Sequence, residues 1–333
     1  MLKIILLSAG ALVLAILAVG WIWEHLSEAA DARRFPAPGR MVQADGRKLH
    51  ILCEGDAPGP TVVIEQGSGS PAVLWRPVRR RIAAFARVCT YDRPGMEWSD
   101  PAPAGRSLED RANDLHALLA AAKVPGPYVL VGHSYGGLLI RLYARDHPEE
   151  VAGMVFVDAA DETAVFDPAY QKFITQAGPF MPVMAAAASV GALRLAGRLS
   201  KSENPPILSK DELATADAFM VRPGFFRVMA DEMASMRAAP AAVRGEYGLG
   251  GPLGDRPVVV LTHAKPFPGP TAVLEKPWPA GQRKLAGLSS DSQHMVAHDS
   301  GHMIYLDEPD LVVDAVRRVH AAARDGTRLA AAT

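Results

Sequence analysis

Short apolar runs alternate with segments of helical periodicity over most of the chain. β-Branched and other apolar residues fill the runs that we predict as strands, at 60–65, 87–91, 128–131, 151–157, 257–262 and, more weakly, 293–297. Apolar residues recur at helical spacing in the segments that we predict as helices, at 75–85, 108–119, 138–144 and 311–319. This alternation predicts the α/β class, with a mostly parallel sheet that is covered by helices on both faces.

Two segments fall outside that alternation. Residues 40–54 indicate a β-hairpin that turns at an Asp-Gly pair. Residues 162–255 have no convincing strand, many alanines and six of the chain's twelve methionines, which indicates a helical cap inserted into the sheet domain. The remaining parts are expected to be a core and a frayed tail, at 40–161 with 256–324 and at 325–333.

The first 23 residues form an apolar segment. Ile4 to Trp23 is a run of twenty residues without a charge, which is enough for a helix to cross a bilayer. Trp21 and Trp23 close the run, as aromatic residues do at a membrane interface. We therefore predict a transmembrane anchor at residues 1–23, with a cleaved signal segment as the alternative.

The residues that flank this segment predict its orientation. Lys3 and the N-terminal amine favour a cytoplasmic start. The part of the chain that follows the segment is then exported, either anchored in the membrane or secreted after cleavage. Residues 24–39 are polar and contain prolines, and we predict a linker there.

Composition excludes several classes of protein. Apolar residues make up 49% and charged residues 21% of the 333 positions, as in a globular protein. The formal net charge of −1 provides no basic field for nucleic acid. We expect neither a metal nor a cofactor, because no motif has metal-ligand or phosphate-binding spacing. The oligomeric state is left open.

The strongest chemical signal lies between two of the predicted elements. Gly132-His133-Ser134-Tyr135-Gly136 follows an apolar strand and opens a helix, and only glycines fit beside the serine in so tight a turn. The serine hydroxyl would be exposed above the carboxyl edge of the sheet, at a helix N-terminus that stabilises negative charge. Ser134 is therefore our candidate nucleophile, and a purely structural serine in a glycine-rich turn is the alternative.

Three motifs together resemble the α/β-hydrolase fold family, with its serine esterases and lipases. They are the turn GHSYGG, the segment RVCTYDRPGMEWSD and the late segment SGHMIYLDEP. The resemblance covers about residues 40–324. It implies a sheet of about eight strands and a catalytic triad whose members follow the chain order serine, acid, histidine.

A serine hydroxyl needs a base to act as a nucleophile. His302 follows the last predicted strand and precedes the final helix, where the family has its base. His294 and His298, at the start and the end of that strand, are weaker alternatives. His133 is expected to be a packed neighbour of the nucleophile.

The position of the acid departs from the common pattern. The loop after strand 257–262, where the family usually has its acid, reads HAKPF and contains no carboxylate. Some relatives place the acid one strand earlier, and Asp158 directly follows strand 151–157. We predict Asp158 as the group that holds the tautomer of the imidazole, with Glu275 and Asp161 as alternatives. A helix cap is the other reading of Asp158.

An oxyanion hole needs two backbone N–H groups. The first is expected from Tyr135, which follows the nucleophile. The second is expected from Ser68, in a loop after strand 60–65 that reads QGSGS where many relatives have His-Gly. In the loop after the next strand, Asp92 and Arg93 are expected to support the site as a structural ion pair or turn.

The chain has two cysteines, Cys53 and Cys89. The strand order that the resemblance implies places their strands side by side. In an exported domain a disulfide is then one possibility, and two buried thiols are the other.

These residues predict a serine hydrolase that cleaves a carboxylic ester through an acyl-enzyme. Methionines and phenylalanines of the predicted cap indicate a small or medium substrate with a hydrophobic group. An amide, thioester or carbon–carbon bond hydrolase is the alternative on the same fold. A second alternative is a non-catalytic homologue that kept the site for ligand binding.

Overall fold

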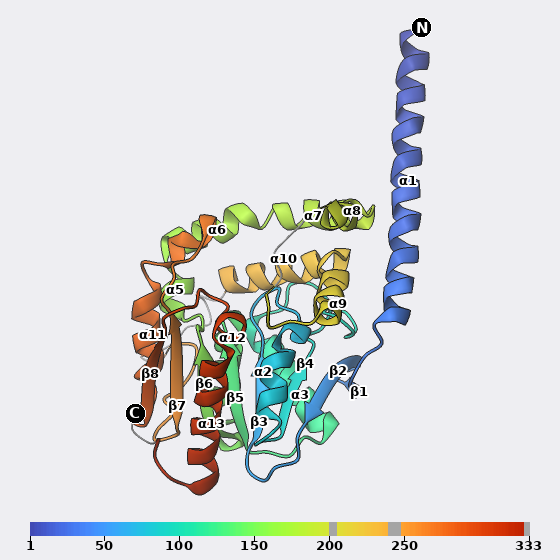
Figure 1. Cartoon of the computed structure of the whole chain (residues 1–333). Helices are drawn as coiled ribbons and strands as arrows, with labels where there is room; N and C mark the ends of the chain where they lie inside the picture. The colour runs from blue at the N-terminus through green and yellow to red at the C-terminus, as the bar shows by residue number, and fades with distance from the viewer. Residues whose placement is uncertain (200–204, 239–247, 330–333) are drawn as a thin grey trace.

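Eight strands form a single sheet (Figure 1). The computed structural model describes residues 1–199, 205–238 and 248–329. The strands are β1 (Arg40–Ala44), β2 (Arg47–Glu54), β3 (Thr61–Glu65), β4 (Val88–Tyr91), β5 (Tyr128–His133), β6 (Val151–Val157), β7 (Val258–His263) and β8 (Ser292–Ala297). Their order is β1-β2-β4-β3-β5-β6-β7-β8, with antiparallel pairing on both sides of β2 and parallel pairing elsewhere. The predicted mostly parallel α/β sheet is confirmed.

Helices cover both faces of the sheet because its central strands are apolar on both faces. Every residue of β3 and β5 is buried. One face packs against α2 (Arg76–Ile82), α12 (Ile304–Asp307) and α13 (Pro309–Asp325). The other face packs against α3 (Leu108–Ala122), α4 (Tyr135–Asp146) and α11 (Trp278–Ala286). Short 3-10 helices lie in the connections that the structure describes, at η1 (Ala72–Trp75), η2 (Pro148–Glu150) and η4 (Gly269–Leu274).

Between β6 and β7 the described residues form helices that lie over the carboxyl edge of the sheet (Figure 1). They are α5 (Glu162–Val165), α6 (Pro168–Ala177), α7 (Phe180–Ser189), α8 (Ala192–Leu199), α9 (Lys210–Met220) and α10 (Pro223–Ala238). This is the segment that the sequence predicts as a cap at 162–255. Residues 200–204 and 239–247 of that prediction lie outside the described residues.

The N-terminal segment is one long helix, α1 (Leu2–Arg34), and among the described residues it is the helix that is long and apolar enough to cross a membrane. The predicted linker at 24–39 is wrong for residues 24–34, which continue the helix. The sequence offers no glycine or proline between Trp21 and Phe35 to end it. Pro36 does, because it disfavours helical geometry at Phe35 before it.

The end of the chain is more ordered than predicted. Helix α13 ends at Asp325, and the backbone N–H of Leu329 donates to a carboxylate oxygen of Asp291 at 3.0 Å. Leu329 also packs against the hydrophobic cluster under α13. The predicted frayed tail at 325–333 is therefore wrong for its described part, and residues 330–333 lie outside the described residues.

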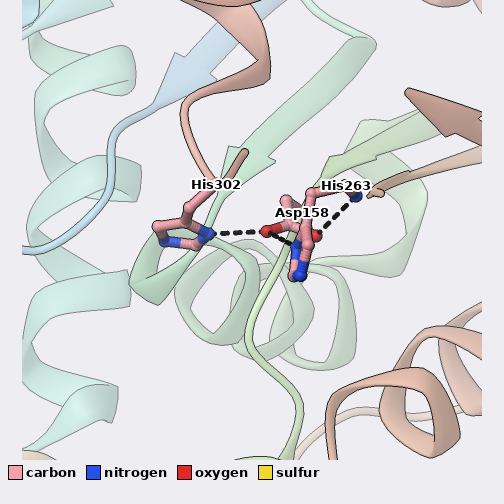
Figure 2. Close-up of side chains that lie close together, drawn as sticks. All are labelled: Asp158, His263 and His302. Atoms are coloured by element: carbon pink, nitrogen blue, oxygen red, sulfur yellow. Dashed lines mark hydrogen bonds and ion pairs between the residues drawn. The ribbon is translucent and has the colours of Figure 1, made fainter. Parts of the chain in front are cut away.

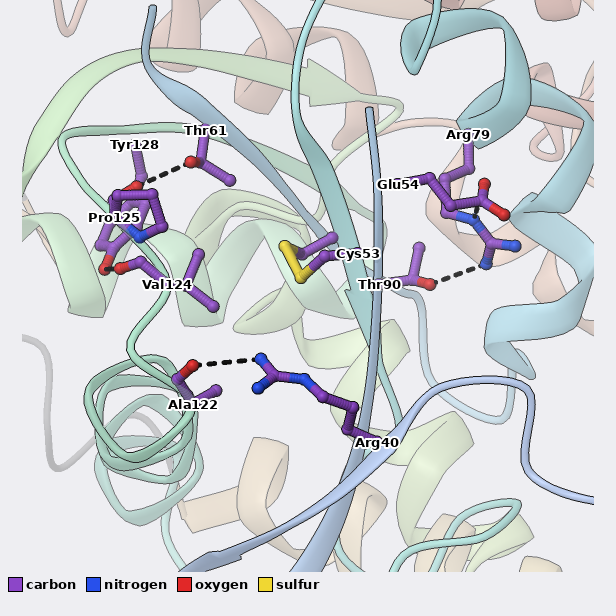
Figure 3. The surroundings of a disulfide bond; sticks show 11 residues. Arg40, Cys53, Glu54, Thr61, Arg79, Thr90, Ala122, Val124, Pro125 and Tyr128 are labelled. Carbon is purple, nitrogen blue, oxygen red and sulfur yellow. Dashed lines mark hydrogen bonds and ion pairs between the residues drawn. A yellow bond between two sulfur atoms is a disulfide. The ribbon is translucent and has the colours of Figure 1, made fainter. Parts of the chain in front are cut away.

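A disulfide joins Cys53 of β2 to Cys89 of β4 (Figure 3). The two residues face each other directly in the antiparallel pair, so the strand register places both side chains together. Beside the disulfide, the side chain of Arg79 donates to Glu54 of β2 at 3.0 Å and to Thr90 of β4 at 2.9 Å. Both contacts tie the same two strands to α2.

Candidate active site

Ser134 occupies a strained turn between β5 and α4. Its φ of 49° and ψ of −121° lie in a region that residues with a side chain seldom adopt. The turn needs glycine at Gly136, because a Cβ there would lie 2.3 Å from the carbonyl oxygen of Glu65. The structure therefore has the strand, tight turn and helix that the sequence motif predicts, with Ser134 at the N-terminus of α4.

His302 and Asp158 form a hydrogen bond at the same edge of the sheet (Figure 2). His302 Nδ1 lies 2.6 Å from Asp158 Oδ2, so the imidazole presents its Nε2 away from the carboxylate. His302 lies beside the turn, since its carbonyl oxygen is 3.0 Å from His133 Nε2 and the two rings are 4.7 Å apart between centroids. Two of the predicted site residues are thus in direct contact, and His302 also contacts the residue that precedes Ser134.

A second histidine, His263 at the end of β7, shares the same carboxylate (Figure 2). His263 Nδ1 lies 2.7 Å from Asp158 Oδ2, and its backbone N–H donates to Oδ1 at 3.2 Å. Trp278 Nε1 also donates to Oδ1, at 2.8 Å. Neither partner was anticipated from the sequence. The available signal was that a histidine opens the HAKPF loop, where a carboxylate is more usual.

These contacts set the charges of the cluster. Burial by itself raises the pKa of Asp158, but hydrogen bonds from His263 and His302 outweigh it and hold that pKa well below its usual range. Burial lowers the pKa of His263, but the hydrogen bond and charge of Asp158 raise it further, so the net shift is upward. Burial and the neighbouring His302 lower the pKa of His133 to about 3, which keeps His133 neutral.

The alternative acids lie elsewhere. Glu275 is half-exposed, lies 3.5 Å from His263 Nε2 and accepts a hydrogen bond from the N–H of Phe267 at 3.0 Å. Asp161 caps α5 by accepting from the N–H of Thr163 at 2.6 Å, so it takes the capping role considered for Asp158. Only Asp158 among the three contacts His302.

The alternative bases do not reach this carboxylate. His294 Nε2 lies 2.7 Å from the hydroxyl of Thr262, on the strand pair β7–β8. His298 is exposed at the end of β8. His302 is therefore the candidate base that the structure brings to Asp158.

The loop after β3 lies against the turn and is held by Arg93. A Cβ on Gly67 would lie 3.2 Å from Cβ of Ser134. The guanidinium of Arg93 donates to the carbonyl oxygens of Gln66 and Gly67 at 2.8 and 2.7 Å. Within the described residues, the amide of Ser68 has no hydrogen-bond acceptor in the protein.

A buried carboxylate of the cap, Glu232 on α10, also holds this loop. It accepts from the hydroxyl of Ser68 at 2.6 Å and from the N–H of Gly69 at 3.3 Å. Its other oxygen accepts from Arg93 Nε at 2.8 Å, while Arg93 also pairs with Glu65 at 2.6 Å. Glu232 was not anticipated from the sequence. Its position depends on how the cap folds back over the sheet.

The support role predicted for Arg93 thus has specific partners, but Asp92 is not one of them. Asp92 pairs with His50 at 2.9 Å and accepts from the N–H of Trp98 at 3.2 Å. Burial raises the pKa of Asp92 to about 7. The two adjacent residues therefore serve separate buried networks.

Asp158, His263 and His302 are also the described residues whose types and spacing could hold a metal ion, with ligand atoms within 4.8 Å of one another. The present arrangement does not fit such a role. Two ligands on one zinc ion at bonds of about 2.0 Å stand roughly 3.3 Å apart in tetrahedral geometry. The nitrogen–oxygen distances of 2.6 and 2.7 Å are those of hydrogen bonds that use the same atoms.

Comparisons with known proteins agree with the fold. The family model described as the alpha/beta hydrolase fold matches residues 60–188. The solved structure of the esterase EaEST from Exiguobacterium antarcticum is similar with a TM-score of 0.62 and 18% identity, covering 84% of this chain and 98% of that one. The chain therefore has the α/β-hydrolase fold.

Similarity to curated sequences is confined to part of the chain. RutD of Variovorax paradoxus (strain S110), which carries the name of a carbamate hydrolase, is 37% identical over 113 residues, 33% of this chain and 42% of RutD. The protein efuK of Hormonema carpetanum, named a probable transporter, is 42% identical over 107 residues, 31% of this chain and 15% of efuK. The chain thus spans less than half the length of these relatives.

Proposed function

We propose that the protein is a serine hydrolase that cleaves carboxylic esters carrying a hydrophobic group. The observation that carries the proposal is the 2.6 Å contact between His302 Nδ1 and Asp158 Oδ2, beside a serine held at positive φ. A carboxylate on Nδ1 fixes the tautomer in which Nε2 can accept a proton. The family-model match over residues 60–188 and the fold shared with an esterase agree with this chemistry.

The proposed reaction has two steps. In the first, Ser134 Oγ attacks the ester carbonyl while its proton passes to His302 Nε2, and the alcohol then leaves with that proton. In the second, water attacks the acyl-enzyme, gives its proton to His302 and releases the acid and the free serine. Asp158 stabilises the imidazolium in both steps and is not itself protonated, which agrees with its lowered pKa.

The proposed oxyanion hole consists of the amides of Tyr135 and Ser68. Tyr135 is the first residue of α4, where a backbone N–H has no partner within the helix. Arg93 holds the carbonyl groups that precede Ser68, which fixes the plane of the loop's peptide groups. Both amides are then oriented before substrate binds, as electrostatic stabilisation requires.

Apolar side chains on both sides support a hydrophobic substrate. The ring of Phe267 lies 5.0 Å from that of His302. On the cap side, the sulfur of Met229 would lie 3.0 Å from a Cβ on Gly69. The partial similarity to RutD makes a carbamate or amide bond the second candidate.

The proposal includes attachment to a membrane through α1, with the catalytic domain on the exported side. It is supported by the uncharged run from Ile4 to Trp23 and by the disulfide, a bond that persists in oxidising compartments. Cleavage of α1 and secretion of the rest is the alternative.

A fluorophosphonate probe and a series of esters with increasing acyl length test the reaction. We expect the probe to label Ser134, and Ser134→Ala to abolish labelling and lower ester turnover roughly 10⁴-fold or more. Circular dichroism checks that the variant is folded. A folded protein that neither reacts with the probe nor turns over any ester would instead be a ligand-binding homologue.

A further inference from the structure

Among the residues whose side chains the structure describes, those exposed on cap helices α7 and α8 are apolar. Phe180, Val183 and Leu195 are 65%, 62% and 51% exposed. The sequence from Phe173 to Leu193 contains no charged residue, although many of its positions face solvent. A soluble surface seldom leaves large apolar side chains grouped without charges between them, so this face is suited to a partner.

The junction of α7 and α8 is fixed against α1. A Cβ on Gly20 would lie 2.5 Å from the carbonyl oxygen of Val190, and one on Gly191 would lie 2.6 Å from the ring of Trp23. Such close backbone approach defines which part of α1 is level with the cap. Residues 2–19 of α1 extend beyond it and are exposed (Figure 1).

Ion pairs attach α8 to the charged part of α1, next to this junction. Arg194 of α8 donates to both carboxylate oxygens of Glu24, at 2.9 and 2.8 Å, and to Asp31 at 2.8 Å. Glu24 is buried in this contact. Because α1 changes from apolar to charged at Glu24, the cap is attached where the spanning segment ends.

These observations fix the depth of the apolar face. Trp21 and Trp23 end the uncharged run, and such aromatic pairs lie at the level of lipid headgroups. Figure 1 shows α7 and α8 running across the direction of α1, beside the part of α1 that contains these residues. A helix that lies across a membrane span at this level lies along the membrane surface.

We propose that the exposed apolar face of α7 and α8 is seated in the bilayer that α1 spans, at the boundary between headgroups and acyl chains. This inference rests on the proposed membrane attachment through α1. The occupant is lipid because the face lies beside α1 at the level where its uncharged run ends. A bilayer that surrounds this run would therefore lie next to the face. In-plane helices with one apolar face bind bilayers in this way.

Site-specific fluorescence tests the proposal on the full chain. Both native cysteines form the disulfide, so one introduced cysteine is the single free thiol for an environment-sensitive nitrobenzoxadiazole label. The positions are Val183→Cys on the cap face, Ala11→Cys in the spanning segment and Ala120→Cys on an exposed site of α3. Ala120 lies near the start of β5, whose other end carries Ser134 under the cap.

Each labelled protein is reconstituted in phosphatidylcholine vesicles that contain a nitroxide-bearing lipid. We expect the label at position 183 to be quenched to roughly half or more of the extent seen at position 11, while the label at 120 is unquenched. Retained fluorophosphonate labelling of Ser134 shows that each variant is folded.

The outcomes separate the two proposals. Quenching at 11 without quenching at 183 overturns the docked cap but leaves the anchor in place, as would happen if a second copy of the chain covered the face. Quenching at 120 equal to that at 183 also overturns it, because no defined face then contacts lipid. Absence of quenching at 11 removes the anchor, and the docked cap with it.

Discussion

Two buried carboxylates hold residues of the proposed active site, and their partners differ in kind. Asp158, from the sheet, accepts hydrogen bonds from two imidazoles and an indole. Glu232, from the cap, is paired with a guanidinium and with the loop of Ser68. An imidazole can change its charge near neutral pH, whereas a guanidinium keeps its charge. Asp158 is therefore suited to support proton transfer, and Glu232 to hold the loop of Ser68 in position.

The largest expected effect tests the sheet side of this comparison. Asp158→Asn keeps the shape of the side chain but removes its charge and the acceptor that fixes the His302 tautomer. We expect kcat for ester hydrolysis to fall about 10⁴-fold, with a folded circular dichroism spectrum. Retention of more than about a tenth of wild-type kcat would remove Asp158 from the proposed triad.

The next effect tests the cap side. Glu232→Ala removes one of two carboxylates from the buried Arg93 and the acceptor of Ser68 and Gly69. We expect the free energy of unfolding to fall by about 3 kcal/mol in chemical denaturation, because a buried charge loses part of its compensation.

A partly exposed acid provides the control. Asp314 of α13 pairs with Arg318 four residues later, and both side chains are partly exposed, so Asp314→Ala is expected to cost about 1 kcal/mol or less. Equal losses for the two variants would mean that Glu232 contributes no more than an ordinary acid of a helix surface.

A smaller effect distinguishes the two imidazoles on Asp158. His263 and His302 both contact Oδ2 of this carboxylate, at 2.7 and 2.6 Å. His263→Asn keeps a hydrogen-bond donor for Asp158 but cannot be protonated. We expect kcat for ester hydrolysis to fall less than about tenfold, because Asp158 keeps its contact with His302. A fall as large as that of Asp158→Asn would mean that His263 takes part in the reaction.

The same substitution has a signed effect on stability. Because folding raises the pKa of His263, the stabilisation from its protonation is complete below the unfolded value of 6.5 and is lost as the pH rises through the folded value. His263→Asn is therefore expected to destabilise the protein more at pH 5.5 than at pH 9, as melting temperatures at both pH values would reveal.

The smallest expected effect concerns the carboxylate that does not touch His302. Glu275→Gln removes a half-exposed charge that lies 3.5 Å from His263. We expect kcat to change by less than about twofold, since exposed pairs contribute little. Loss of activity in this variant, with activity retained in Asp158→Asn, would exchange the two assignments.

The sheet was predictable because strands buried on both faces consist of continuous apolar residues. The placement of Ser134 and Asp158 was also within reach of sequence reasoning, because each directly follows such a strand and the carboxyl ends of parallel strands share one edge. His302 follows β8, which is less apolar and less buried. His263 was missed because its pairing depends on the register of β6 against β7, which aligns Val157 with Leu261. The sequence of neither segment indicates that register.

Glu232 was beyond sequence reasoning for a related reason. It lies 139 residues from Arg93, and only the three-dimensional placement of α10 brings the two together. The predicted linker was wrong at residues 24–34 for a local reason. These residues are polar, but they contain no proline or glycine that would end the helix. A polar segment without proline or glycine can continue an apolar helix once tertiary ion pairs hold it.

The disulfide has a mechanical consequence for a chain attached at its N-terminus. Tension on α1 would pass through Phe35 and β1 into β2, which lies near the edge of the sheet. Without a crosslink, such a load would separate β2 from β4 by breaking their hydrogen bonds one after another. The disulfide between Cys53 and Cys89 keeps the two strands together and transfers the load to β4, inside the sheet. The turn that carries Ser134 is thereby shielded from forces that act on the anchor.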